Sequence, residues 1–114
     1  MKKLFLAVVA LMICAGALAQ VPRAEYPRPQ MERADWVNLN GEWSYTLDLV
    51  KTGWERDLMK STGFDSKIIV PFAPESKLSG VEHLEFIPCI WYQREISIPA
   101  EWSGKDVLLN FGAV

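Results

Sequence analysis

The sequence predicts an all-β fold, an antiparallel β-sandwich that is incomplete in this chain. Two observations predict it. Apolar residues alternate with polar ones in separate segments after residue 36, and prolines or Asn-Gly and Ser-Gly pairs separate these segments, with almost no helical periodicity. The 114 residues allow at most one domain, and a composition of 50% hydrophobic and 23% charged residues is typical of a globular chain.

The first 19 residues have the features of a secretory signal peptide. Two lysines precede an unbroken apolar run at residues 4–14, and Ala17-Leu18-Ala19 offers the small residues that signal peptidase accepts, so we expect cleavage before Gln20. The run is shorter than the roughly 20 residues of a membrane span, so we expect no membrane association after cleavage. A lipoprotein signal that uses Cys14 is the alternative. The expected location is periplasmic or extracellular, in a bacterium.

The remaining residues divide into a leader and a domain. Residues 20–35 contain three prolines without periodicity and are predicted to be an extended, proline-rich leader. Residues 36–114 are predicted to be the N-terminal part of the β-sandwich. Four segments are predicted to be strands, because their residues alternate or are β-branched: 43–49, 67–70, 91–98 and 106–111.

The segments between these strands are predicted to be irregular. Asn40-Gly41 supplies turn chemistry before the first strand. Residues 51–66 are expected to form a long connection with a short helix near residues 54–60, and residues 71–84 an ordered loop. Arg94 lies on a largely apolar strand face and is expected to need a carboxylate partner. The chain ends directly after an apolar segment, so we expect a sandwich that is cut short and has open edges.

Four motifs occur in order along the chain: NLNGEW at 38–43, IVPFAPES at 69–76, WYQREISIP at 91–99 and VLLNFGAV at 107–114. Together they resemble the N-terminal sugar-binding domain of glycoside hydrolase family 2, a jelly-roll of the galactose-binding type. That family includes β-galactosidases, β-glucuronidases and β-mannosidases. The sequence PRPQ at 27–30 is similar to the leader of its secreted bacterial members.

The resemblance implies a role without catalysis for this chain. It implies the N-terminal domain of an exported retaining glycosidase that hydrolyses O-glycosyl bonds of β-linked glycans. In the family, two glutamates about 5 Å apart perform this reaction, and they lie on a downstream TIM barrel. No position here matches them, so no catalytic residue is expected and the chain alone is predicted to be inactive. The implied partners are β-linked carbohydrate and the missing downstream domains, without a cofactor. A stand-alone carbohydrate-binding module and an inactive truncated product are the alternatives.

Two groups of residues are candidates for contact with sugar. In β-galactosidases of the family, an asparagine after the Val-Pro motif reaches the catalytic pocket, and Ala73 takes that place here. Glu75 and Ser76 are left as the candidates for contact with sugar or with the barrel. Three tryptophans outside the clean strands are candidates for stacking on sugar rings: Trp36, Trp54 and Trp102. Burial in the core or in a domain interface is the alternative for each.

Other site classes are not favoured. Glu82, His83 and Glu85 are close in sequence, but they are too few to hold a metal without further ligands, so we expect a surface loop and no metal site. Cys89 is interpreted as a small buried hydrophobe. The formal charge of −2 and the absence of a basic cluster argue against a nucleic-acid partner.

Overall fold

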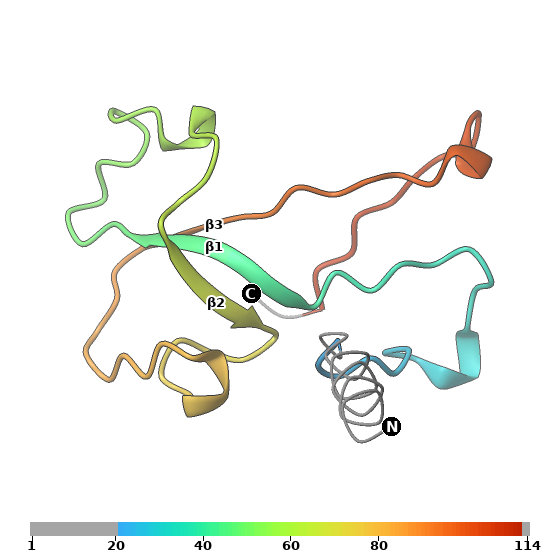
Figure 1. Ribbon diagram of the computed structural model, residues 1–114, viewed down its shortest axis with the longest axis horizontal. Helices are drawn as coiled ribbons and strands as arrows, with labels where there is room; N and C mark the ends of the chain where they lie inside the picture. The colour runs from blue at the N-terminus through green and yellow to red at the C-terminus, as the bar shows by residue number, and fades with distance from the viewer. Residues whose placement is uncertain (1–20, 113–114) are drawn as a thin grey trace, which may run out of the picture.

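The computed structural model describes residues 21–112, which form one small antiparallel sheet and long irregular segments (Figure 1). The strands are β1 (Gly41–Leu47), β2 (Ser66–Val70) and β3 (Ile90–Gln93), in the order β2-β1-β3. The described residues also contain four short 3-10 helices: η1 (Pro29–Met31), η2 (Leu58–Lys60), η3 (Lys77–Ser79) and η4 (Ala100–Trp102).

The expectation of an all-β fold is confirmed, because the described residues form a partial all-β domain. Residues 21–112 contain no α-helix, and no helix there is long and apolar enough to cross a membrane. The predicted signal peptide, residues 1–19, and the last two residues of the VLLNFGAV motif lie outside the described residues.

One face of the sheet carries apolar or aromatic residues from all three strands. The register places Trp43 opposite Ile68 and Tyr45 opposite Tyr92. Because side chains alternate across a strand, these four residues share one face. Ile68, at 1% exposure, is the one large hydrophobic side chain that is fully buried among the described residues. The segment with η3 packs against β2 on the lower side of Figure 1, so the small core lies between the sheet and this segment.

The opposite face of the sheet is polar toward the start of β1. Ser44 lies between Lys67 of β2 and Gln93 of β3 in the register. The Ser44 hydroxyl donates a 3.1 Å hydrogen bond to the Gln93 carbonyl oxygen. Trp91 lies on the same face, opposite Thr46. The two faces of β3 therefore carry one large aromatic each.

A buried carboxylate organises the connection that follows β1. The Asp48 side chain is 1% exposed and accepts hydrogen bonds from four donors: Thr52 N at 3.0 Å, Gly53 N at 2.7 Å, Arg56 Nη2 at 3.0 Å and Trp91 Nε1 at 3.1 Å. Two of these donors are backbone amides of the turn, and one is on β3. This carboxylate therefore ties the turn at residues 49–57 to the sheet.

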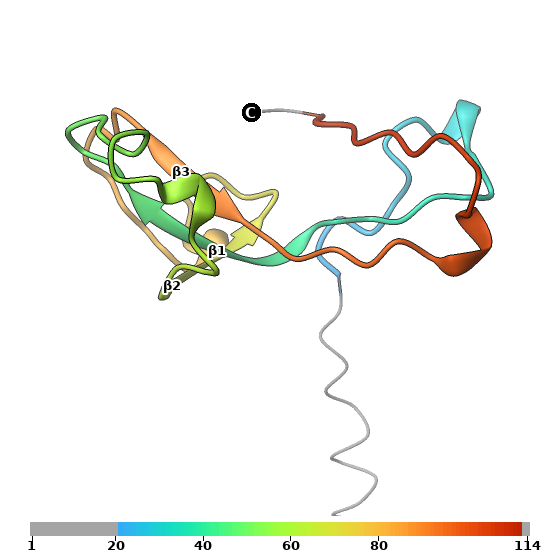
Figure 2. The same cartoon turned by 90° about the horizontal axis from the view of Figure 1, so that it is seen from above.

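Two of the predicted strands differ from the structure. The strand predicted for 91–98 ends at Gln93, and the strand predicted for 106–111 does not form. A strand needs a neighbour about 4.8 Å away along its whole length. Beyond residue 94 the chain diverges from β1, and both segments run past the sheet with no ladder (Figures 1 and 2). They are extended, but no adjacent edge pairs with them.

Three local expectations are also corrected. The helix expected near residues 54–60 is reduced to turns and η2. Among the described residues Arg94 has no carboxylate partner, and its Nη1 donates to the carbonyl oxygens of Leu39 at 2.6 Å and Asn40 at 3.0 Å. These two acceptors provide the negative end of a dipole in place of a full charge. The guanidinium also lies 6.0 Å from the ring centroid of Trp43, within reach of a cation–π attraction.

The side chains before β1 attach the leader rather than form a tight turn. Asn40 Nδ2 donates to the carbonyl oxygens of Pro22 at 3.1 Å and Arg23 at 3.2 Å. Asn38 Nδ2 also donates to Arg23 O, at 3.1 Å. Gly41 begins β1 with a φ of +121°, a conformation that favours glycine. The leader therefore lies against the start of the domain.

Candidate functional site

The loop after β2 holds the two residues that the family resemblance singled out. It begins with a cis Val70–Pro71 peptide bond. The Ser76 hydroxyl accepts a hydrogen bond from Leu78 N at 3.2 Å and caps η3. The buried Ser79 hydroxyl donates to Ser76 O at 2.7 Å. The hydroxyl of Ser76 thus has a local structural partner, and the expected ordered loop at residues 71–84 is present.

Glu75 is exposed at this loop, near the apolar face of the sheet. The pKa of Tyr92 is raised above its ordinary value of 10.0, first by burial of the phenol and then by the negative charge of Glu75 and by Tyr45. A negative charge disfavours the phenolate form of a tyrosine. The sugar-contact role of Glu75 and Ser76 stays a prediction.

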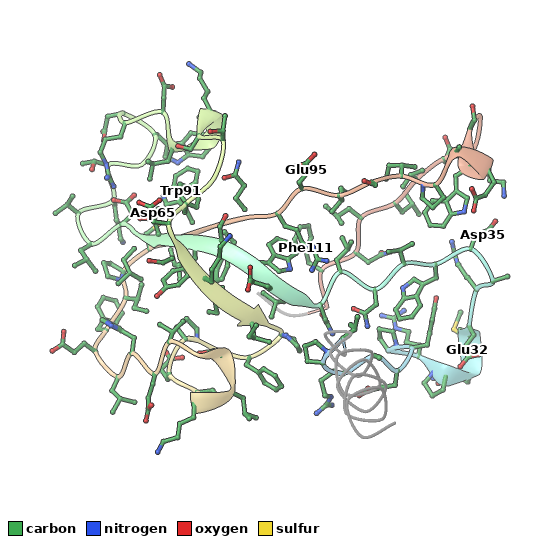
Figure 3. The ribbon with its side chains drawn as sticks, in the orientation of Figure 1. Glu32, Asp35, Asp65, Trp91, Glu95 and Phe111 are labelled. Atoms are coloured by element: carbon green, nitrogen blue, oxygen red, sulfur yellow. The ribbon has the colours of Figure 1, made fainter. Side chains whose placement is uncertain are left out.

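The three candidate tryptophans do not share one surface. Trp36 is half-buried, with its ring 4.6 Å from that of Tyr26. Trp102 is half-buried at the end of η4. Trp54 is 68% exposed, with its ring edge-on to Trp91 at 5.3 Å. Figure 3 labels Trp91 and Asp35, the neighbour of Trp36, on opposite sides of the molecule. No single sugar ring contacts all three.

Trp54 lies on the turn that Asp48 holds. Burial of the Asp48 carboxyl, which raises its pKa, is the largest influence on this group. The four hydrogen-bond donors together outweigh it, and the pKa lies below the ordinary value of 3.8. Asp48 is therefore an anion at neutral pH. Because all four donors converge on it, its role is to hold the turn and not to transfer protons.

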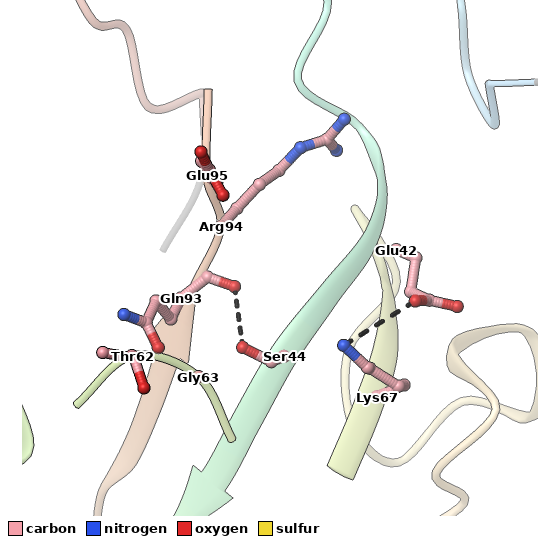
Figure 4. Close-up of a pocket in the computed structure, with 8 residues that line it drawn as sticks. All are labelled: Glu42, Ser44, Thr62, Gly63, Lys67, Gln93, Arg94 and Glu95. Atoms are coloured by element: carbon pink, nitrogen blue, oxygen red, sulfur yellow. Dashed lines mark hydrogen bonds and ion pairs between the residues drawn. The ribbon is translucent and has the colours of Figure 1, made fainter. Parts of the chain in front are cut away.

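An open pocket of about 530 Å³ lies on the polar face of the sheet (Figure 4). Eight residues from all three strands and their flanking loops line it: Glu42, Ser44, Thr62, Gly63, Lys67, Gln93, Arg94 and Glu95. The sequence analysis missed this pocket. Polar residues at every second strand position were the available signal.

One polar atom of this pocket lacks a partner. The Gln93 amide nitrogen donates a short hydrogen bond to Ser61 O, which fixes the orientation of the carboxamide. Gln93 Oε1 is buried and accepts no hydrogen bond from any residue between 21 and 112. Buried acceptors without a donor are uncommon in folded proteins. The atom has almost no surface accessible to solvent, so this acceptor lies within the wall of the pocket and not at its surface.

Other chemistry is not assembled among the described residues. Within residues 21–112, no three His, Cys, Asp or Glu side chains lie close enough to share a metal ion. Cys89 is half-buried, and its carbonyl oxygen accepts the Asp48 amide at 2.9 Å. Cys89 therefore takes part in backbone hydrogen bonding and does not belong to a site.

The fold and the pocket define a partial, sheet-based all-β domain, and the comparisons with known proteins add its context. No family model matches the chain. The chain is similar to the β-glucuronidase of Canis lupus familiaris, with 29% identity, and to that of Felis catus, with 28%. Each match extends over 100 residues, 77% of this chain and 15% of the relative. The chain thus spans about a seventh of these relatives. Weak as they are, the matches support the resemblance to glycoside hydrolase family 2 and a glycoside hydrolase context.

Proposed function

We propose that this chain is the non-catalytic N-terminal domain of an exported, retaining glycoside hydrolase of family 2 that acts on β-linked glycans. The observation that carries the proposal is the similarity to two β-glucuronidases, each several times longer than the chain. The antiparallel sheet agrees with the all-β domain that the resemblance implies. The catalytic glutamates of the parent enzyme would lie on a TIM barrel outside this sequence.

In this proposal the loop after β2 faces the sugar or the barrel. Glu75 is exposed there, and the capping interactions of Ser76 and Ser79 hold the loop in one conformation. An ordered loop loses little further entropy when it contacts a partner. The loop thus suits the rim of an active site that another domain supplies.

The decisive experiment is to read the source DNA beyond the codon for Val114. A continuing frame of several hundred codons, with two glutamates at the ends of predicted barrel strands, is expected. The longer protein should cleave a nitrophenyl β-glycoside, and proton NMR should show the β-anomer as the first product, since retaining enzymes keep the configuration. A stop codon at that point, with no separate barrel-containing subunit, would contradict the proposal.

We also propose export, because the first 19 residues have the composition of a signal peptide. Mass spectrometry of protein from the native host should give a mature chain that starts at Gln20. An intact Met1, or a lipid on Cys14, would contradict cleavage at this position. The periplasm of a bacterium is the expected location.

A stand-alone carbohydrate-binding module is the second candidate function. One observation favours it, since Trp54 is 68% exposed on a turn that a buried carboxylate holds. Titration of the chain with β-linked oligosaccharides, followed by tryptophan fluorescence, separates the two functions. A saturable change that Trp54→Ala abolishes would favour the module.

A further inference from the structure

We propose that Asn40 is a modification site, at which spontaneous deamidation by water releases the leader from the start of β1. Asn40 is half-buried and directly precedes Gly41, the first residue of β1. The inference rests on this pair of residues and on their contacts with the leader. It does not depend on the proposed glycosidase activity.

The first argument is the residue that follows Asn40. In deamidation, the backbone nitrogen of the next residue attacks the side-chain carbon Cγ of the asparagine. Gly41 has no Cβ, so no side chain crowds this attack. The other two asparagines of the sequence, Asn38 and Asn110, each precede a bulky apolar residue. Asn40 is therefore the asparagine that reacts most readily.

The reaction needs water and base, without an oxidant or a cofactor. Hydroxide removes the amide proton of Gly41, and the nitrogen lone pair forms a bond to Asn40 Cγ. The bond between Cγ and Nδ2 breaks, and the NH2 group leaves as ammonia after it takes a proton from water. The succinimide ring that results adds a water molecule and opens to aspartate or isoaspartate. An amide is thereby replaced by a carboxylate, and nothing is oxidised or reduced.

The second argument is the role of the Asn40 amide in the structure. Its Nδ2 donates to the carbonyl oxygens of Pro22 at 3.1 Å and Arg23 at 3.2 Å. Neither aspartate nor isoaspartate retains this NH2 group, so both hydrogen bonds are lost in either product. In aspartate, a negative oxygen without a proton to donate also faces the two carbonyl oxygens, which is repulsive. The modification therefore detaches the leader at this point.

The third argument is that the release proceeds in one direction and is confined to the leader. The two hydrogen bonds hold the Asn40 amide while the leader is docked, so the attack takes place when the leader separates transiently. The product cannot form these bonds again, and the leader stays released. On the side of β3, Arg94 Nη1 donates to Leu39 O and Asn40 O. Both products keep acceptor oxygens there, so the start of β1 remains attached.

The first experiment ages the full chain in mildly alkaline buffer and follows each asparagine by peptide mass spectrometry. Asn40 should convert at least about tenfold faster than Asn38 and Asn110, because glycine leaves the attack unhindered. A synthetic peptide of residues 36–44, which has no leader to dock, shows that the buffer supports the reaction.

The second experiment measures release of the leader by trypsin cleavage after Arg23. The protease must bind the Arg23 carbonyl oxygen, and Asn40 donates to this same atom. Asn40→Asp, which carries one of the products from the start, should be cleaved there about tenfold faster than the wild type, because cleavage follows the population of the open form. The aged wild type should show the same gain.

Two controls assign this gain to the leader. Asn110→Asp adds the same charge at an exposed position outside the leader, and it should be cleaved after Arg23 like the wild type. Lys67 lies within β2, where cleavage requires the sheet to open. Cleavage after Lys67 should therefore stay constant in every variant.

Two results would overturn the inference. If Asn40 stays intact in the full chain while the peptide of residues 36–44 converts, the docked leader protects this residue and it is no modification site. If Asn40→Asp is cleaved after Arg23 at the wild-type rate, or only together with cleavage after Lys67, the amide does not hold the leader. Neither result bears on the glycosidase proposal, which the reading frame tests independently.

Discussion

Two regions with the same sequence character have different structures in this protein. The sheet body, residues 41–93, and the arm, residues 94–112, both contain alternating apolar residues. In the sheet body the strands pair and Ile68 is 1% exposed. In the arm Ile98 is 50% exposed and Leu108 is 69% exposed. Figures 1 and 2 show the arm leaving the sheet and returning without a neighbouring strand.

The difference teaches that an alternating pattern does not suffice to form a strand. A strand forms when its backbone groups find a partner edge and its apolar side chains find a cover. The sheet body has both, through β1 at its centre and the loop with η3 against β2. Within residues 21–112, the arm makes one side-chain ion pair to the leader, between Lys105 and Asp35 at 2.7 Å. The following predictions test this contrast.

The largest effect is expected from the buried core. Ile68→Ala should lower the free energy of unfolding by about 2–5 kcal/mol, because it removes buried methyl groups and leaves a cavity. Ile98→Ala, the matched change in the arm, should alter it by about 0.5 kcal/mol or less, since that side chain already contacts water. Urea unfolding followed by tryptophan fluorescence measures both. Equal losses would show that the arm is packed as tightly as the sheet body.

A second packing test uses glycine. A Cβ on Gly53 would lie 2.2 Å from Trp91 Nε1, while a Cβ on Gly112 would meet no atom within 4 Å. Gly53→Ala should therefore cost about 1–3 kcal/mol of unfolding free energy, through displacement of the Trp91 ring. Gly112→Ala in the arm should be close to neutral. The comparison fails if the two variants unfold at the same urea concentration.

The buried carboxylate of the sheet body predicts a dependence on pH. Because the pKa of Asp48 is lowered in the folded state, its contribution to stability is present above the ordinary value of 3.8 and is lost as pH falls through the lower folded value. Asp48→Asn removes the charge while keeping the shape. The wild type should be more stable than this variant at neutral pH, and the gap should close below pH 3.8.

Urea midpoints of the two proteins, measured from neutral to acidic pH, check this prediction. A gap that stayed constant across the range would mean that the variant loses stability because an acceptor oxygen is replaced by an amide NH2 group, and not because the charge is removed.

The smallest effect is expected where the arm meets the leader. Lys105→Ala should lower stability by about 0–1 kcal/mol, because both partners of the ion pair are more than half exposed. About 1 M salt should remove most of that difference by screening. Arg23→Ala, which breaks another exposed ion pair within the leader, is the control and should behave alike. A larger loss for Lys105→Ala would show that the arm docks on the leader through more than this pair.

Part of the fold could be predicted from local sequence. The alternation from Trp43 onward and the β-branched residues before Pro71 located β1 and β2 within two residues of their observed bounds. The predicted end of β3 was wrong. Residues 94–98 continue the alternation, but they diverge from β1 and do not pair with it. The periodicity of a segment indicates only whether that segment favours a strand. Strand pairing depends on two segments that lie side by side.

The candidate site was predicted only in part. Trp54 and Glu75 were singled out as candidates for contact with sugar, and both side chains are exposed. Their distance from one another and the pocket around Gln93 were not predicted. Thr62 and Gln93 are 31 positions apart and meet only because β1 lies between β2 and β3.

The sequence by itself determined the class of fold, the approximate positions of β1 and β2, and the expectation of export. These properties depend on composition and on the spacing of neighbouring residues, which the chain carries at every point. Only the tertiary structure decided three things: the carbonyl partners of Arg94, the four donors around Asp48, and the unpartnered oxygen of Gln93. Each depends on groups from distant parts of the chain, and their distances exist only once the sheet has formed.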